Sequence, residues 1–277
     1  MKKTFLILFT LLSISIIAKA QTDNTETTKV HFKLGLNYNS GLNYYGRTDS
    51  LRSSGVFPVA ELWLTKDFYI NAAPVFVNNK LSSFDYAGTI TTIGYQHTSD
   101  KLISNIYVLK PFYKQSSQLV QSALKAQSGI SFAFLNKALN LTAGADAKLS
   151  DKTDIGATGG VDHIFKITNA DNSAFVIDPS FYAYAGTQQF TNTYYKKKSS
   201  FLLFPVNDQQ VTESVNKFNI LAYEASVPVV FVKGNMLVSL TPSYIMPQNL
   251  ITVPNRPDLS ERGKDMFYTT IGVKYTF

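Results

Sequence analysis

Residues that could do acid–base or nucleophilic chemistry are few in this sequence and lie far apart. The chain of 277 residues contains three histidines and no cysteine. The absence of cysteine excludes disulfides, thiolate metal sites and cysteine nucleophiles. The histidines are His31, His97 and His163, and each is isolated in the sequence. We therefore expect no metal site and no cofactor.

Two histidines have neighbours of the kinds found in catalytic sets. His97 is close to Ser99 and Asp100, but the members of a catalytic triad normally converge from distant parts of a fold, so a polar turn is expected here. Asp162 and His163 are adjacent on a predicted strand, where successive side chains point to opposite faces. They cannot form a base with its orienting group unless a bulge intervenes. We expect that the protein is not an enzyme, and a hydrolase is the least favoured alternative.

Charged side chains recur singly within apolar-patterned segments. They are Lys33, Glu61, Asp146, Asp162, Asp178, Glu224 and Lys274, with Asn71, Gln127, Ser131 and Lys148 at comparable positions. The three aspartates could pair across strands for acid–base work. A polar lining of an interior explains the whole set more simply, and that interpretation depends on the elements that carry these residues.

The end of the sequence indicates what those elements are. From Phe267 to Phe277 every second residue is mostly large and apolar, and the residues between are small or polar apart from Tyr268. This period of two predicts a β-strand with one apolar and one polar face. A terminal strand that closes on Phe resembles the closing strand of Gram-negative outer-membrane β-barrel proteins, which the assembly machinery reads. The resemblance assigns this signal to Phe267, Ile271, Val273, Tyr275 and Phe277.

The same alternation recurs along the chain and predicts an all-β protein, a transmembrane antiparallel up-and-down barrel. Strands are expected over residues 30–38, 55–64, 68–77, 87–96, 102–113, 125–135, 138–149, 154–167, 174–195, 216–232, 236–246 and 267–277. Bacterial barrels of this class have an even number of strands, with short turns at one end and longer loops at the other. Taken as one strand, residues 174–195 give about 12 strands and preserve this alternation. A break at Gly186-Thr187-Gln188 would give one strand more and disturb it.

Several prolines lie inside the predicted strands, at positions where a missing N–H disfavours a central ladder, and five of them mark the register as uncertain. These five are Pro58, Pro74, Pro179, Pro228 and Pro242. Bulges or strand ends are expected to accommodate them. A soluble barrel of the lipocalin type has the same period with its apolar rows inside, so alternation alone leaves the direction of the faces open.

The first twenty residues have the features of a secretory signal peptide. Met1-Lys2-Lys3 is basic, an apolar run follows, and Ala18-Lys19-Ala20 matches a cleavage site. The apolar run is shorter than the roughly 20 residues that a spanning helix needs. We expect a cleaved signal peptide at 1–20, a flexible lead-in at 21–29 and a single barrel domain at 30–277. Such a protein would reside in the outer membrane of a Gram-negative bacterium, surrounded by its lipids.

Two arrangements of the interior charges remain open. Lys274, Lys33 and Glu61 fall on neighbouring strands once the barrel closes, and the four acidic residues from Asp146 to Glu224 lie on consecutive strands opposite. Facing walls of opposite sign would create a transverse field that could orient polar solutes. Alternatively, these charges pair with one another and fill a narrow lumen.

Two functional classes follow from these two interiors. The first is a passive or weakly selective channel for small polar solutes. The second is a structural, adhesive or assembly-linked surface barrel with a closed lumen, which would use the loop around Leu42-Asn43-Tyr44-Tyr45 and the loop near Lys196 as contact surfaces. Nucleic acid is not an expected partner, because the only basic run, Lys196-Lys197-Lys198, is accompanied by no nucleic-acid-binding pattern.

Overall fold

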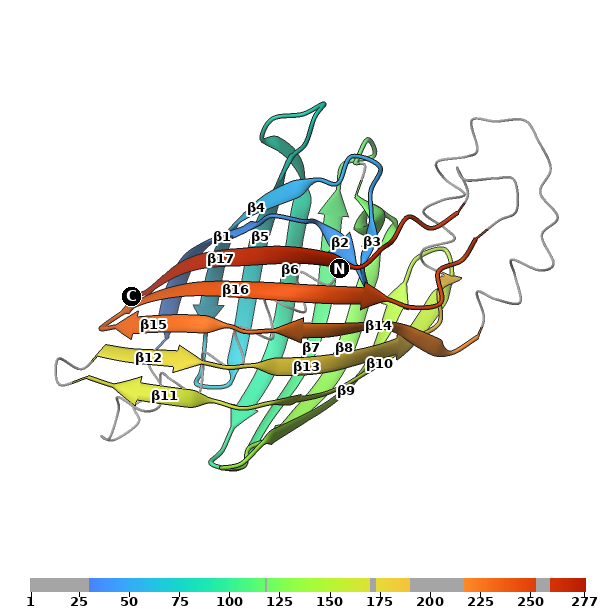
Figure 1. Cartoon of the computed structure of the whole chain (residues 1–277). Helices are drawn as coiled ribbons and strands as arrows, with labels where there is room; N and C mark the ends of the chain where they lie inside the picture. Colours follow the sequence, from blue (N-terminus) through green and yellow to red (C-terminus); the bar gives the residue numbers. More distant parts are fainter. Residues whose placement is uncertain (1–29, 118, 170–172, 190–216, 253–259) are drawn as a thin grey trace, which may run out of the picture.

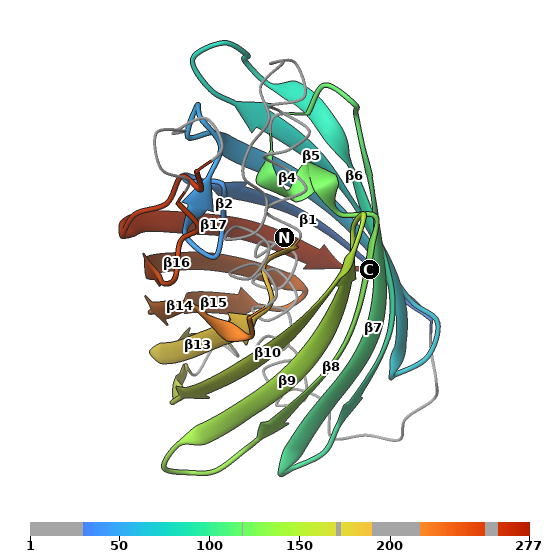
Figure 2. The same cartoon turned by 90° about the vertical axis from the view of Figure 1, so that its right-hand side faces the viewer.

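Fifteen strands in the described part of this chain form one closed antiparallel sheet (Figures 1 and 2). The structure is a computed structural model that describes residues 30–117, 119–169, 173–189, 217–252 and 260–277. Nine strands run without interruption: β1 (His31–Asn39), β4 (Ser54–Trp63), β5 (Phe68–Asn78), β6 (Asp85–Thr98), β7 (Leu102–Tyr113), β8 (Ala126–Phe134), β9 (Asn140–Leu149), β16 (Met236–Pro247) and β17 (Met266–Thr276). Pairing of β1 with β17 closes the barrel. No helix in the described ranges has the length and hydropathy needed to cross a membrane.

Three further passes are each divided into two strands. They are β10 (Thr153–Asp162) with β11 (Phe165–Thr168), β12 (Ser173–Ile177) with β13 (Ser180–Gly186), and β14 (Asn219–Ser226) with β15 (Val229–Lys233). The barrel therefore has the twelve strands that the sequence predicts. The segment that begins at Ala174 makes a single pass that ends at Gly186. Residues 187–189 are not in a strand, so the expected continuation of the strand is wrong there, and its remainder, 190–195, lies outside the described residues.

Each of these three divisions faces a proline of the next pass, and two of them also contain one, Pro179 or Pro228. At each division, an N–H group donates to a proline carbonyl of the next strand: His163 N to Pro179 O at 3.1 Å, Asp178 N to Pro228 O at 2.9 Å, and Val227 N to Pro242 O at 3.1 Å. Pro58 and Pro74 face each other, because the strand pairing on either side of them aligns these two positions. Prolines are thus accommodated where the ladder is interrupted.

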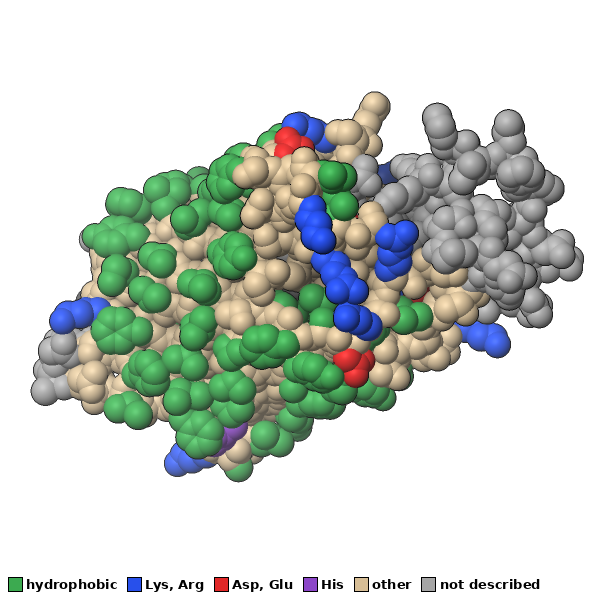
Figure 3. Space-filling view, turned by 45° about the horizontal axis from the view of Figure 1, so that its top comes forward, with side chains coloured by type: hydrophobic (Ala, Val, Ile, Leu, Met, Phe, Trp, Pro, Cys, Tyr) green, Lys and Arg blue, Asp and Glu red, His purple; other side chains and the backbone are tan. Residues whose placement is uncertain are grey.

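The apolar rows of the strands face outward. On β17, Phe267, Ile271, Val273 and Tyr275 are 45–65% exposed, whereas Tyr268 is 2% exposed and points inward. Equivalent rows on the other strands cover the wall with apolar side chains, and Lys and Arg side chains gather toward its ends (Figure 3). Such a surface is lipid-facing. The alternative of a soluble barrel with apolar rows inside is wrong, and the chain has the fold of an outer-membrane barrel.

The connections differ at the two ends of the barrel. The short ones join the strands at the end where β1 begins and β17 stops, and they include 64–67, 99–101 and 234–235. We call this the turn end. Longer connections, including 40–53, 114–125 and 248–265, lie at the opposite end, which we call the loop end. The connection 150–152 is the short exception at the loop end, as the sequence predicts.

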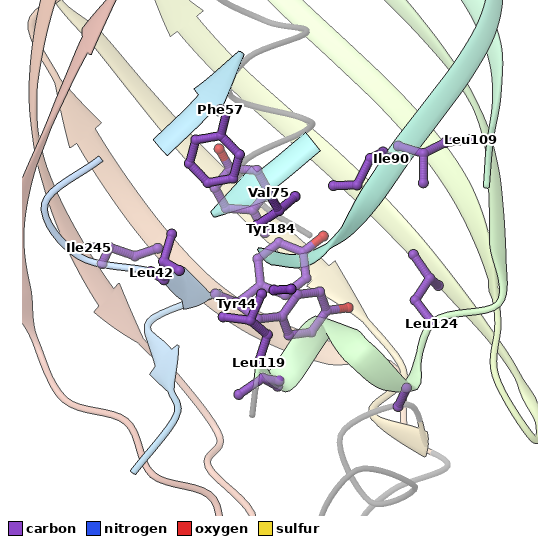
Figure 4. Close-up of a cluster of buried hydrophobic side chains, with 14 of the residues drawn as sticks. Leu42, Tyr44, Phe57, Val75, Ile90, Leu109, Leu119, Leu124, Tyr184 and Ile245 are labelled. Carbon is purple, nitrogen blue, oxygen red and sulfur yellow. The ribbon is translucent and has the colours of Figure 1, made fainter. Parts of the chain in front are cut away.

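The loop that follows β1 folds into the loop end of the barrel. It carries the two-residue strands β2 (Asn43–Tyr44) and β3 (Arg47–Thr48), and it contacts the 3-10 helix η2 (Val120–Ala123), where Gln121 Nε2 donates to Asn43 O at 3.0 Å. Figure 4 shows hairpin residues Leu42 and Tyr44 in one cluster with Tyr184 and Ile245 of the wall. The expectation that this loop offers Leu42 to Tyr45 as an exposed contact surface is wrong, because the interior buries these apolar side chains.

Tyrosine–glycine pairs hold the inner face of the wall together. Tyr69 is directly opposite Gly94, Tyr107 is opposite Gly129, and Tyr182 is opposite Gly160. Each tyrosine ring covers its glycine so closely that an added Cβ would lie 2.0–2.7 Å from ring atoms. Rings that cover cross-strand glycines compensate for the packing that glycine lacks in a strand.

Candidate functional site in the barrel interior

A charged group lines the wall formed by β17, β1 and β4. Lys33 is directly opposite Glu61, and Lys274 is directly opposite Gly35. Lys274 Nζ lies 2.6 Å from Glu61 Oε1. The lysine side chain therefore passes over Gly35 of β1 and reaches β4. Trp63 Nε1 donates to Glu61 Oε2 at 3.2 Å, and Lys33 Nζ lies 4.5 Å from the Trp63 ring centroid. Glu61 is therefore held by two partners, with a second lysine close by.

The inward row of β1 is less buried than the inward row of the adjacent β4. Lys33, Gly35 and Asn37 are partly exposed, although they point into the barrel. The inward residues of the adjacent β4 are buried. Gly35 has no side chain and Lys274 bends toward Glu61, which leaves the inward face of β1 less covered than that of β4. We call this face, with Lys274 of β17 and Glu61 of β4, the strip. The strip is polar, since it carries two ammonium groups and an amide.

The opposite wall holds Asp146 and Lys148 on β9. Lys148 Nζ pairs with the Asp146 carboxylate beside it, and both side chains are buried. Lys148 Nζ also lies 5.6 Å from the ring centroid of Tyr45. Tyr45 belongs to the loop 40–53 that folds into the barrel, which we call the inward loop. Asp146 is thus neutralised within its own strand. It does not add to an acidic wall.

Asp162 and Asp178 are brought together on neighbouring passes. Their carboxyl groups lie close enough to interact electrostatically, and Asp162 accepts from Asn140 Nδ2 at 2.7 Å and from Tyr182 OH at 3.2 Å. Asp178 Oδ1 is buried without a hydrogen-bond partner. Glu224 stands apart and accepts from Tyr268 OH. Of the four acidic residues predicted to form one wall, the structure joins Asp162 with Asp178 and gives the other two partners of their own.

The uncharged residues of the predicted lining are buried on the inner face. Asn71, Gln127 and Ser131 are 4–6% exposed, and Gln127 Nε2 donates to Tyr107 OH at 2.7 Å. On the same face, Asn105 Nδ2 and Thr92 Oγ1 are buried and have no hydrogen-bond partner. The interior thus combines paired charges, tyrosine rings and open amide and hydroxyl groups.

Sequence reasoning missed the residue with the densest polar contacts of the interior. Arg47 on β3 is 1% exposed and donates to Glu261 Oε2 at 2.9 Å, Gln188 Oε1 at 2.9 Å, and the carbonyls of Tyr45, Leu221 and Gln248 at 3.1 Å. It joins the inward loop to β14 and to the connection after β16. A signal was available in the sequence: Leu42 and the pair Tyr44-Tyr45 are apolar or aromatic within an otherwise polar loop.

Tyr44 and Tyr45 also connect the inward loop to the wall. Tyr44 and Tyr45 rings are 4.5 Å apart, and Tyr45 lies 5.2 Å from Tyr184 of β13, measured between centroids. Burial raises the pKa of both Tyr44 and Tyr45 well above its usual value. Both phenols therefore stay neutral at physiological pH, and the loop adds no charge of its own at this point.

The histidines do not assemble a catalytic set. His97 Nδ1 lies 3.5 Å from Asp67 Oδ2 in a neighbouring turn, and the hydroxyl of Ser99 donates to Leu102 O instead of to His97. His163 occupies the division after Asp162 and contacts the Phe165 ring at 4.4 Å between centroids. His31 stacks on Trp63 at 5.8 Å. Among the described residues, no group of three His, Asp or Glu side chains could hold a metal ion.

No protein-family model and no curated protein matches this chain. Similar solved structures include a KdgM porin, with 9% identity and a TM-score of 0.48 over 89% of this chain and 99% of that one. The COG4313 outer membrane channel from Pseudomonas putida F1 has 9% identity and a TM-score of 0.47, over 93% of this chain and all of the other. LpxR from Salmonella typhimurium has 8% identity and a TM-score of 0.47, over 88% and 99%. At such sequence identities the likeness concerns the fold alone.

Proposed function

We propose that this protein is an outer-membrane channel for small polar solutes, with a route along the strip formed by β17, β1 and β4. The observation that carries this proposal is the partial exposure of Lys33, Gly35 and Asn37 on the inward face of β1. A barrel filled for structural purposes alone would bury this row as it buries the inward row of β4. Two lysines and one glutamate leave the strip with a net positive charge, which favours anions over cations at this level.

The route is restricted at the loop end by the inward loop. Leu42, Tyr44 and Tyr45 are 3–7% exposed there, and Arg47 ties their loop to the wall through its bond to Leu221 O of β14. A passage that remains beside such a loop admits small solutes and excludes large ones. We therefore expect low conductance and weak selectivity, set by size and by the lysines of the strip.

Conductance in a planar bilayer tests the proposal. The purified and refolded protein is expected to give steady ion currents, and an absence of current at any voltage would overturn the channel. Because the chain has no cysteine, single introduced cysteines can map the route. A cationic thiol reagent should reduce the current through Asn37→Cys. It should leave Leu36→Cys unchanged, since Leu36 points outward and is 54% exposed.

A second candidate function, a surface barrel with a closed lumen, is favoured by one specific observation. The hairpin β2–β3 and helix η2 form a buried apolar cluster with wall residues that include Tyr184 and Ile245. This packing is continuous from loop to wall at the loop end. If the bilayer shows no current and Asn37→Cys fails to react with the reagent, the closed barrel becomes the better account.

Export and assembly belong to the same proposal. Residues 1–29 lie outside the described part of the chain, and we propose that residues 1–20 are removed as a signal peptide on export from the cytoplasm of a Gram-negative bacterium. We further propose that the closing strand is read by the barrel assembly machinery. No catalytic step is included in the proposal, because the contacts of His97 and His163 match polar-turn and aromatic packing roles.

A further inference from the structure

The lipid-facing wall carries an amine within its apolar rows on β7. Lys110 points outward between Val108 and Phe112, which are 57% and 54% exposed. A lysine side chain is energetically costly in the centre of the hydrocarbon, and this cost falls to near zero at the interface with the headgroups. Lys110 therefore marks the level at which the hydrocarbon ends and the headgroups begin, on the side of the loop end.

Lys110 bends toward the loop end. Its Nζ lies 5.3 Å from the ring centroid of Phe112, two residues farther along the strand in that direction. Long amines in a membrane wall extend in this way toward the headgroups. In the part of the chain that the structure describes, no carboxylate forms an ion pair with Lys110, whereas Lys114 pairs with Asp85 and Lys125 pairs with Asp151. The Lys110 ammonium is thus available to an external anion.

A second amine approaches the same place from farther out. Lys114 follows Phe112 in the outward row, and its Nζ lies 5.4 Å from the ring centroid of Tyr86 on β6. Its contact with Asp85 is loose, at 3.4 Å, and both side chains are about half exposed, at 46% and 58%. An exposed pair of this kind contributes little to stability. A stronger anion can therefore displace the Asp85 carboxylate.

The two amines converge on one small area. Tyr86 OH and Thr89 Oγ1 are 2.7 Å apart, and Thr89 is directly opposite Phe112. Thr89 therefore connects Tyr86, whose ring lies near the Lys114 amine, with Phe112, whose ring lies near the Lys110 amine. Phe76 extends this aromatic surface, with its centroid 5.8 Å from Tyr86. Two ammonium groups, two hydroxyls and adjoining aromatic rings thus lie on neighbouring positions at the loop end of β5, β6 and β7.

We propose that this area, formed by Tyr86, Thr89, Lys110, Phe112 and Lys114, binds the phosphate-bearing headgroup of an anionic lipid in the leaflet at the loop end. The ammonium groups neutralise the phosphate. Of the hydrogen-bonded hydroxyls of Tyr86 and Thr89, the one whose proton is free donates a hydrogen bond to a phosphate oxygen. Aromatic rings are favoured at the level of the headgroups. The acyl chains then lie along the outward row of β7 toward the turn end, where the side chains are apolar. The proposal concerns the outer wall and is independent of conduction through the lumen.

Lipid binding to the purified barrel in a neutral detergent tests the site by native mass spectrometry, with phosphatidylglycerol and phosphatidylcholine as probes. We expect phosphatidylglycerol to bind more tightly than phosphatidylcholine. The double variant Lys110→Gln/Lys114→Gln should lose affinity for phosphatidylglycerol on the order of thirtyfold, at about 1 kcal/mol per lysine. Asp85→Asn should raise that affinity, because it removes the competing carboxylate. Lys101→Gln, in the turn at the other end of β7, is the matched control and should bind as the unaltered protein does.

Three results would overturn the proposal. They are equal binding of the two lipids, unchanged phosphatidylglycerol binding in the double variant, and an equal loss in Lys101→Gln. Inorganic phosphate at millimolar concentration distinguishes a lipid site from a site for free phosphate: if it displaces the lipid completely, the lipid assignment is wrong. Should the double variant fail to refold, Lys110→Gln alone and Asp85→Asn still give changes of opposite sign.

Discussion

Lys274 on β17 forms an ion pair with Glu61 on β4 at 2.6 Å, although β1 lies between the two strands. The contact is available because β1 presents Gly35 at this level, where an added Cβ would lie 3.2 Å from Val273 O and 3.7 Å from Lys274 Cβ. The pair occupies the strip through which we propose that solutes pass. Its charges should therefore govern the selectivity of the channel.

The first prediction concerns that selectivity. Glu61→Gln leaves two lysines without a carboxylate and should shift the reversal potential in a salt gradient toward anion preference. Lys274→Met leaves Glu61 with Lys33 nearby and should shift it toward cations. Lys101→Met, in a turn at the barrel's end, is the control for a general effect of charge. Identical reversal potentials in all of these proteins would mean that ions do not pass the strip.

The second prediction concerns the glycines covered by tyrosine rings. At Gly160 an added Cβ would lie 2.0 Å from Tyr182 Cδ1, whereas nothing lies within 4 Å of the position at Gly159. Gly160→Ala should lower the free energy of unfolding by about 1–3 kcal/mol, as overpacking does. Gly159→Ala should have little effect. Urea titrations of the refolded barrel measure both, and equal stability of the two variants would show that the ring moves aside without cost.

The third prediction concerns the anchor of the inward loop. Arg47→Met removes five hydrogen bonds and leaves the buried Glu261 carboxylate without its cation. Leaving a buried charge unpaired costs about 3 kcal/mol or more, and the loop should leave the interior. We expect a larger single-channel conductance and faster proteolysis within residues 40–53. Arg47→Met/Glu261→Leu removes both charges and should restore part of the stability, with no such recovery if the pair is irrelevant.

The fourth prediction is a dependence on alkaline pH. Burial raises the pKa of Tyr44 and Tyr45 above the ordinary value of 10.0, so the folded state favours the neutral phenols. The resulting stabilisation is complete below the unfolded pKa near 10. It falls as the pH rises above that value, because the unfolded chain then ionises first. Tyr44→Phe/Tyr45→Phe should therefore lose less stability between about pH 9 and 12 than the unaltered protein. Parallel losses in urea titrations would contradict this assignment.

The fifth prediction separates a folding role from an assembly role at Phe277. Its ring is 63% exposed and contacts Tyr275 at 4.8 Å and Phe32 at 6.0 Å between centroids. Phe277→Ala therefore removes little buried area and should leave the stability of the refolded barrel nearly unchanged. Its level in the outer membrane of cells should nonetheless fall. Leu81→Ala, which alters an apolar side chain 79% exposed in a loop, is the control and should assemble normally.

Much of the wall was predictable, because a strand's period of two couples each residue to one face. The polar row that contains Lys274 and the apolar row that contains Ile271 follow from sequence parity alone. The count of twelve strands followed from the alternation of long and short connections. Parity did not determine which of the two faces points out of the barrel. Only the exposure of Phe267 and its row shows that the apolar face meets lipid.

The contacts between side chains inside the barrel were decided by the tertiary structure. Lys274 meets Glu61 across Gly35, and Asp162 meets Asp178 beside Pro179, because register and strand divisions set heights along the barrel axis that no local pattern encodes. The fate of the polar loop after β1 is a second case. Leu42 and Tyr45 are too few to form a core within their own loop, and only a preformed ring of strands offers them one. Local sequence thus determined the faces of the strands, and closure of the sheet decided which side chains meet inside.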